Sequence, residues 1–106
     1  MEGLLSIIIP SYNEGLLIDN TANVVVDIMT EHKIPYEILF VDDGSKDDTW
    51  NRIQAASKKH EHVRGVHFSR NFGKESAITA GLTYAKGDCC VVMDLSLIHI
   101  SEPTRP

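Results

Sequence analysis

The sequence has only two cysteines among its 106 residues, and no long hydrophobic run. Cys89 and Cys90 are neighbours, and neighbours in a strand point to opposite faces, so a disulfide between them is unfavourable. We therefore expect both to be buried thiols in a reducing compartment. No apolar run approaches the roughly 20 residues of a membrane helix, and the N-terminus lacks the features of a signal peptide. The chain is thus expected to be cytoplasmic and without a membrane segment, which is compatible with a parent protein at the cytoplasmic face of a membrane.

Basic residues are also scarce, because ten Lys and Arg stand against fifteen Asp and Glu, a formal net charge of -5. General binding of nucleic acid depends on clustered Lys and Arg, so we expect no nucleic-acid partner. A small phosphorylated ligand remains compatible with this charge, because its binding depends on local groups. With 42% hydrophobic and 24% charged residues, the composition is that of one globular domain.

Three familiar motifs are missing as well. The phosphate-binding pattern G-x-x-x-x-G-K-[ST] does not occur, and Lys74 is followed by Glu75. The pattern G-x-G-x-x-G does not follow the first apolar run, and no G-x-S-x-G is found. These absences argue against a P-loop NTPase, a dinucleotide-binding fold and an α/β-hydrolase.

The sequence does contain a regular alternation of short apolar runs and longer helical patterns. The runs cover residues 4–9, 36–41, 63–68 and 89–93, and the helical patterns cover residues 18–32, 45–60 and 74–85. Ser45 and Asp48 resemble a capping pair at the start of the second helix. Strands that alternate with helices predict an α/β fold, a mainly parallel sheet with flanking helices and right-handed crossovers.

The last residues, 95–106, read LSLIHISEPTRP and continue neither pattern. The fourth strand should be followed by a crossover helix, and these residues have no helical period. They also resemble a translated sequencing adapter. We therefore expect a domain over residues 1–94 and a non-native tail over residues 95–106, which makes the chain a truncated one.

Polar residues follow the expected strands, and the carboxyl ends of parallel strands share one edge of a sheet, where ligands bind. Asp42 and Asp43 come after the second strand, as turn and capping residues or as acceptors for a base or ribose. Asn13 and Glu14 come after the first strand, and they either cap the next helix or contact the same groups.

Positive charge and a further carboxylate are expected at the same edge. Arg70 and Lys74 form either a solvated basic surface or a phosphate site at a helix N-terminus. Asp94 is either a turn residue or a ligand of Mg²⁺ or Mn²⁺, hard cations that prefer oxygen and bridge diphosphates.

Taken in order, these residues resemble the family-2 inverting glycosyltransferases, which have the GT-A fold. The resemblance covers residues 4 to 94 and rests on Pro10-Ser11-Tyr12-Asn13-Glu14, Asp42-Asp43-Gly44-Ser45, Ser69-Arg70-Asn71-Phe72-Gly73-Lys74-Glu75 and Val92-Met93-Asp94. The Arg-Asn-Phe-Gly-Lys segment is similar to that of the polyprenyl-phosphate and dolichyl-phosphate sugar transferases. The resemblance implies that the chain is the Rossmann-like, nucleotide-sugar-binding half of such an enzyme.

The resemblance also implies roles for single residues. Pro10, Tyr12, Glu14 and Asp42 would contact the base and ribose, and with the adjoining Asp43 they are the candidate nucleotide-binding residues. Arg70 and Lys74 would lie near the diphosphate. Asp94 would be the first acid of a D-x-D motif for Mg²⁺ or Mn²⁺, but Ser96 stands where the second acid is expected. The implied partners are a nucleotide-diphosphate sugar and, for the parent, a lipid-phosphate acceptor such as polyprenyl phosphate. The truncated chain itself is expected to be inactive in sugar transfer.

Two other classes share parts of this pattern. A receiver-like signalling domain needs an Asp at the end of the third strand, where this sequence has His67-Phe68-Ser69. A nucleotidyltransferase usually has a glycine-rich basic loop after the first strand, and residues 10–15 contain no basic residue. Both are kept as alternatives.

Overall fold

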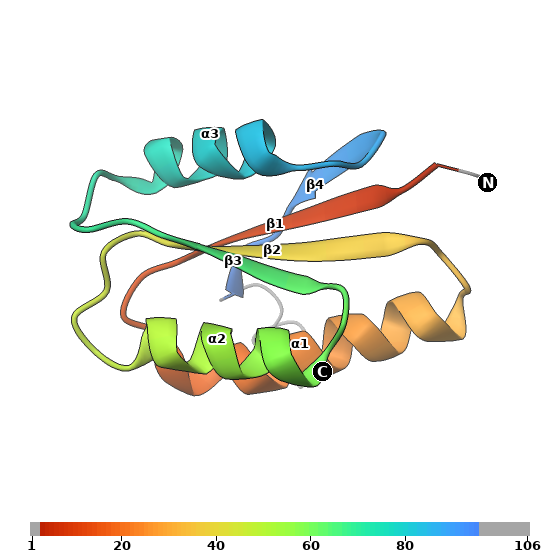
Figure 1. Cartoon of the computed structure of the whole chain (residues 1–106), viewed down its shortest axis with the longest axis horizontal. Coiled ribbons are helices and arrows are strands. Elements are labelled where there is room, and N and C mark those ends of the chain that lie inside the picture. The colour runs from red at the N-terminus through yellow and green to blue at the C-terminus, as the bar shows by residue number, and fades with distance from the viewer. Residues whose placement is uncertain (1–2, 96–106) are drawn as a thin grey trace, which may run out of the picture.

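In the computed structural model, which describes residues 3–95, strands and helices alternate along the chain. They are β1 (Leu5–Ser11), α1 (Gly15–Glu31), β2 (Tyr36–Asp42), α2 (Thr49–Lys59), β3 (Val63–His67), α3 (Lys74–Tyr84) and β4 (Cys89–Val92). All strand pairs are parallel, in the order β3-β2-β1-β4. Helices α1 and α2 cover one face of the sheet and α3 the other (Figure 1). The α/β fold with a parallel sheet is therefore confirmed.

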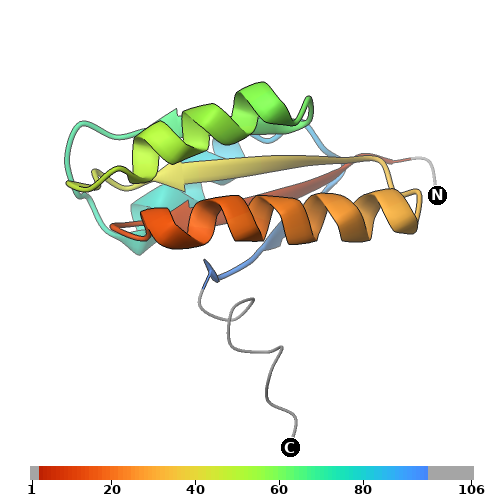
Figure 2. The ribbon, with the colours of Figure 1, turned by 90° about the horizontal axis from the view of Figure 1, so that it is seen from below.

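The two central strands carry most of the core. Residues 6 to 9 of β1 are all buried, as expected for a strand covered on both faces. Helices α1 and α2 lie side by side over one face (Figure 2). The helical pattern predicted from residue 18 onward is confirmed, and the buried residues of α1 include Ile18, Ala22, Val25 and Met29, which lie on one face of the helix. On the other face Ile8, Leu39 and Val41 pack against Ala77 of α3.

Helix α3 approaches the sheet closely at Gly81. A Cβ atom at this position would lie 2.4 Å from the Cγ2 atom of Ile8 in β1. The absence of a side chain therefore lets α3 lie directly on the strand. Gly81 therefore has a packing role, and this contact sets the distance between the sheet and the helix whose first residue is Lys74.

The buried carboxylate of Glu37 links the strands at the end of the sheet that lies away from Asp42 and Asp43. Glu37 of β2 accepts hydrogen bonds from Ser6 Oγ at 2.5 Å, from Lys86 N at 2.6 Å and from Arg64 at 2.7 Å. Burial alone raises the pKa of Glu37, but these hydrogen bonds and the charge of Arg64 outweigh it and hold the pKa below its usual range. The network joins three strands to the segment between α3 and β4.

The start of the second helix was predicted wrongly. Helix α2 begins at Thr49, and its flanking residue Asp48 makes no side-chain capping bond. Ser45 does not cap this helix, because its Oγ accepts a hydrogen bond from the backbone N–H of Asn13 at 2.8 Å. Asp47 instead accepts a bond from the Thr49 N–H at 2.9 Å. The segment before α2 is therefore a turn whose polar groups are used across the site.

The expectation of buried cysteines is also wrong. Cys89 and Cys90 are free and exposed, and every residue of β4 is exposed. Within residues 3–95, β4 pairs with β1 alone and so forms an edge of the sheet. An apolar strand predicts burial only where neighbours cover it, and β4 lacks that cover in the part of the chain described.

Leu95 departs from the expected tail. It is 1% exposed and packs in the core cluster on the α1 side of the sheet, while the non-native origin of residues 95–106 stays a prediction. The remainder of the expected tail, residues 96–106, lies outside the described residues. No helix within residues 3–95 is long and apolar enough to cross a membrane.

Candidate functional site

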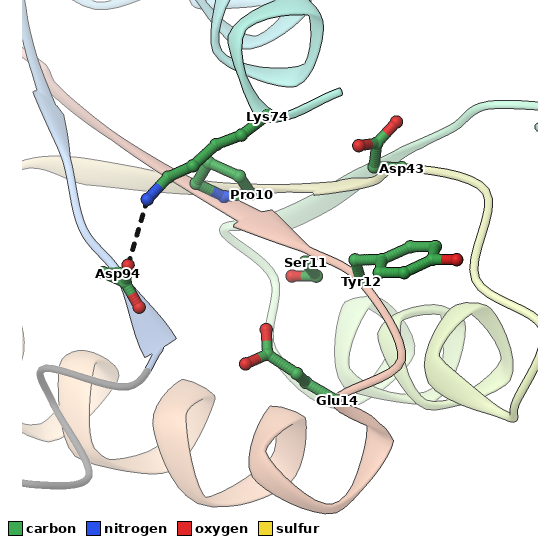
Figure 3. Close-up of a pocket in the computed structure, with 7 residues that line it drawn as sticks. All are labelled: Pro10, Ser11, Tyr12, Glu14, Asp43, Lys74 and Asp94. Carbon is green, nitrogen blue, oxygen red and sulfur yellow. Dashed lines mark hydrogen bonds and ion pairs between the residues drawn. The ribbon is translucent and has the colours of Figure 1, made fainter. Parts of the chain in front are cut away.

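A cavity of about 250 Å³ opens at the carboxyl ends of the strands (Figure 3). It is lined by Pro10, Ser11, Tyr12, Glu14, Asp43, Lys74 and Asp94. The residues proposed for the site from sequence therefore lie in its wall, except Asn13, Asp42 and Arg70. Ser11 also lines the cavity, and its place in the polar run after the first strand was a signal from which this could have been predicted.

The segment from Tyr12 to Glu14 is held by the turn before α2. Asn13 has a positive φ of 50°, a conformation that Asn tolerates better than most residues. Its backbone N–H donates to Ser45 Oγ at 2.8 Å, and its Oδ1 accepts from the Lys46 N–H at 2.7 Å. The Glu14 N–H donates to Thr49 Oγ1 at 3.0 Å. These bonds fix the two cavity residues on either side of Asn13.

Asp42 accepts a hydrogen bond from this turn and does not line the cavity. The residue is fully buried, at 0% exposure. Its Oδ1 accepts from the Ser45 N–H at 3.0 Å, and its Oδ2 accepts from His67 Nδ1 at 2.8 Å. The His67 ring is in turn stacked on Trp50, with 4.7 Å between ring centroids. Asp42 therefore has two hydrogen-bond partners within the protein, and its contact with a base or ribose stays a prediction.

Asp43, the next residue, is part of the cavity wall. Its Oδ1 accepts from the Phe72 N–H at 2.8 Å, and its Oδ2 accepts from the Gly73 N–H and from Asn71 Nδ2, both at 3.1 Å. Gly44 follows with a φ of 74°, and a Cβ there would lie 2.2 Å from the Arg70 carbonyl carbon. The end of β2 and the segment before α3 are thus joined directly beside the cavity.

Lys74 and Asp94 meet across the cavity. The Nζ atom of Lys74 lies 3.1 Å from Oδ2 of Asp94 (dashed line in Figure 3), with 61% and 38% of the two side chains exposed. The other predicted phosphate ligand, Arg70, lies outside the wall, and its guanidinium carbon is 5.1 Å from the centre of the Phe72 ring. One of the two expected cations is therefore in the site.

The cavity carries more negative than positive charge among the groups that line it. Burial raises the pKa of Glu14 above its usual range, and the charge of Asp94 raises it further, while Lys74 offsets part of the effect. Glu14 and Asp94 offer the hard oxygen donors that Mg²⁺ and Mn²⁺ prefer. Within residues 3–95, however, no group of three or more His, Cys, Asp or Glu is arranged to hold a metal. The donor set therefore fits an ion that takes its remaining ligands from phosphate and water.

A family model described as Glycosyl transferase family 2 matches residues 6–99. The chain belongs to this family. Membership favours the glycosyltransferase interpretation over the nucleotidyltransferase and receiver-like alternatives. It also accounts for the polar segments that follow the strands, in the sequence order typical of this family.

The chain is similar to curated proteins of the same kind. It is 45% identical over 101 residues to "Putative glycosyltransferase CsbB" of Bacillus subtilis (strain 168), covering 92% of this chain and 30% of the relative. It is 36% identical over 102 residues to "Undecaprenyl-phosphate 4-deoxy-4-formamido-L-arabinose transferase" of Shewanella sediminis, again covering 92% and 30%. The chain therefore spans about 30% of the length of these relatives.

A solved structure with the same architecture is the mannosyltransferase PcManGT from Pyrobaculum calidifontis, in complex with GDP-Man and Mn²⁺. The TM-score is 0.74 and the sequence identity 26%, and the match covers 90% of this chain and 28% of the other. The described part thus has the architecture of one part of a GT-A glycosyltransferase.

Proposed function

We propose that this chain binds the nucleotide-diphosphate part of a sugar donor in the cavity at the strand ends. The observation that carries the proposal is the meeting of Tyr12 and Glu14, Asp43, and Lys74 in one wall, from three segments that are distant in sequence. Such a site, concave and with a few convergent polar groups at the strand ends of a parallel sheet, is typical of nucleotide binding. We assign residues 1–94 to this donor-binding part.

The base and ribose are assigned to the β1 and β2 side of the cavity. Tyr12 is 40% exposed and offers a ring face for stacking, and Pro10 and Ser11 flank it. Asp43, and not Asp42, is the carboxylate that faces the ligand, because only Asp43 lines the cavity. Three donors within the protein, Asn71 Nδ2 and the N–H groups of Phe72 and Gly73, bond to its carboxylate, which can accept about four hydrogen bonds and so has capacity for one from the base or ribose.

The diphosphate is assigned to the α3 side. Lys74 is the first residue of α3, so its ammonium adds to the positive end of the helix dipole. The opposite wall holds the carboxylates of Glu14 and Asp94, which repel phosphate unless a cation intervenes. A divalent ion shared by these oxygens and the diphosphate would neutralise charge on the leaving group. The relative PcManGT, solved with GDP-Man and Mn²⁺, supports this assignment.

For the longer protein we propose transfer of the sugar to a lipid phosphate such as polyprenyl phosphate. A phosphate oxygen of the acceptor attacks the anomeric carbon on the face opposite the nucleotide. The bond from that carbon to the diphosphate oxygen breaks, the configuration inverts, and the nucleoside diphosphate leaves. The name of the Shewanella sediminis relative, an undecaprenyl-phosphate sugar transferase, supports this acceptor class. We also propose that the reaction takes place in the cytoplasm, without nucleic acid as a partner.

Titration of the ¹⁵N-labelled chain with GDP and UDP, followed by amide chemical shifts, tests the donor-binding proposal. We expect shifts at Ser11, Tyr12, Asp43 and Lys74, and none at the far end of the sheet around Glu37. Shifts confined to the groove between α1 and α2, near Asn23 and His60, would overturn the assignment of the cavity.

A further inference from the structure

The cavity already contains a positive charge where a metal ligand is expected. The Nζ atom of Lys74 lies 3.1 Å from Oδ2 of Asp94, the residue that the family resemblance assigns to the divalent cation. In Figure 3 the Lys74 side chain extends toward Asp94, and both residues line the cavity. A divalent cation and this ammonium would therefore compete for the same Asp94 carboxylate.

We propose that Lys74 is the competitor of the divalent cation for Asp94, and that it holds this carboxylate until the diphosphate draws the ammonium away. The inference rests on the proposed function, because it assigns both the metal and the diphosphate to this cavity. It adds a second role for Lys74, which in the ligand-free chain neutralises Asp94 and opposes metal binding.

The strength of the contact fits such an exchange. Both side chains are well exposed, and exposed ion pairs of this kind are individually weak. The pair therefore lowers the affinity for a metal by a modest factor and does not block the site. Lysine is suited to this, because its ammonium is a compact charge on a flexible four-carbon stem. A diphosphate with at least two negative charges is a stronger partner for the ammonium than one carboxylate.

The anchoring of α3 makes the exchange local. Asp43 holds the backbone N–H groups of Phe72 and Gly73 directly before Lys74, and Gly81 lies against Ile8 of β1. The segment before α3 and the body of the helix are thus both held, so that movement of the Lys74 side chain does not require movement of the helix. Glu14, also in the wall, is the other carboxylate that would share an ion with Asp94.

The test measures Mn²⁺ binding to the chain without nucleotide, through the electron paramagnetic resonance signal of free Mn²⁺ at low salt. We expect Lys74→Met to bind Mn²⁺ about two- to fivefold more tightly than the wild type, the factor that an exposed ion pair supplies. Lys74→Arg, which keeps the charge, should stay close to the wild type. Adding Asp94→Asn to Lys74→Met should remove the gain.

The matched control is Arg70→Met, which removes one positive charge from the same segment without touching Asp94. It should change Mn²⁺ affinity less than Lys74→Met does. An equal gain in Mn²⁺ affinity in both variants would mean that the affinity depends only on the net charge near the site, and it would overturn the proposal. Failure of Lys74→Met to bind Mn²⁺ more tightly, including no binding at all, would also overturn it. Because nucleotide is absent from this experiment, failure of the donor-binding proposal is seen separately, in the GDP and UDP titrations.

Discussion

The backbone N–H of Phe72 donates a 2.8 Å hydrogen bond to Oδ1 of Asp43, which lies 29 residues earlier in the chain. Gly73 N–H and the Asn71 amide bond to the other oxygen of the same carboxylate. One buried side chain therefore fixes the segment that leads into α3 and at the same time forms part of the cavity wall. Its loss should affect both the order of that segment and the site.

Replacing Asp43 by Asn should loosen the 71–73 segment. An amide keeps the shape but loses the charge, and one of its two ends donates instead of accepting, so at least one backbone N–H loses its partner. We expect a loss of about 1–3 kcal/mol in the free energy of unfolding, measured by urea denaturation. Hydrogen exchange at Phe72 and Gly73 should become faster. Unchanged hydrogen exchange at these two amides would contradict the role of the Asp43 carboxylate in holding the 71–73 segment.

Ser45→Ala should weaken nucleotide binding without a large loss of stability. Ser45 Oγ accepts from the Asn13 N–H, and Asn13 lies between the cavity residues Tyr12 and Glu14. Without this bond, Asn13 is freer to leave its positive φ, and the flanking residues lose their position. We expect roughly 0.5–1.5 kcal/mol of destabilisation and weaker GDP or UDP binding. Ser45→Thr, which keeps the hydroxyl, should restore the binding, and a Thr variant as weak as Ala would contradict this positioning role.

Glu14→Gln should stabilise the chain at neutral pH more than at acid pH. The pKa of Glu14 is raised by burial and by Asp94, so the folded state holds this proton more tightly than the unfolded state does. That contribution is present below the ordinary pKa near 4.5 and is lost as pH rises through the higher folded value. A neutral amide removes the loss. Thermal unfolding from pH 4 to pH 7 checks this, and a stability gain that is largest at acid pH would contradict it.

Glu37→Gln serves as a comparison of opposite sign. Burial raises the pKa of Glu37, but hydrogen bonds from Ser6, Lys86 and Arg64 bring it below its usual value. Its contribution to stability is therefore present above about pH 4.5 and is lost as pH falls through the lower folded pKa. We expect the variant to lose about 1–3 kcal/mol at neutral pH, and less below pH 4. A loss that is independent of pH would show that only packing had changed.

Leu95→Ala should destabilise the domain, because this side chain is 1% exposed within the core cluster. Truncation of a buried leucine costs about 2–5 kcal/mol through lost burial and the remaining cavity. Leu16→Ala is a matched control, because Leu16 is 82% exposed. If Leu95→Ala were as stable as Leu16→Ala in urea, native packing would end at Asp94, as the sequence pattern alone suggested.

Much of the fold follows from patterns that depend only on neighbours in sequence. The approximate positions of the strands and helices and the parallel direction of the strands follow from periodicity and from alternation, which local chemistry fixes. The direction of Asp42 and Asp43 is different in kind. Strand alternation requires that they point to opposite faces, but which of them meets a ligand depends on Ser45, His67 and the 71–73 segment, which lie far away in the sequence.

Exposure at β4 could not be predicted for a similar reason. The run Cys89–Val92 is apolar, and apolarity indicates burial only if other elements cover the strand. The start of α2 was misplaced because Ser45 has the chemistry of a cap but is used by Asn13 across the turn. In each case the competing partner is distant in sequence and near in space.

Calorimetric titration of GDP and UDP into the chain tests the central claim, that the cavity binds a nucleotide diphosphate through Asp43. We expect saturable binding of at least one nucleotide to the wild type. Asp43→Ala should bind at least about tenfold more weakly, a change of about 1.4 kcal/mol. Asp27→Ala on the exposed side of α1 is the matched control, and circular dichroism confirms that each variant is folded. Equal affinity of the folded Asp43→Ala variant and the wild type, or no binding of either nucleotide to the wild type, would contradict the account.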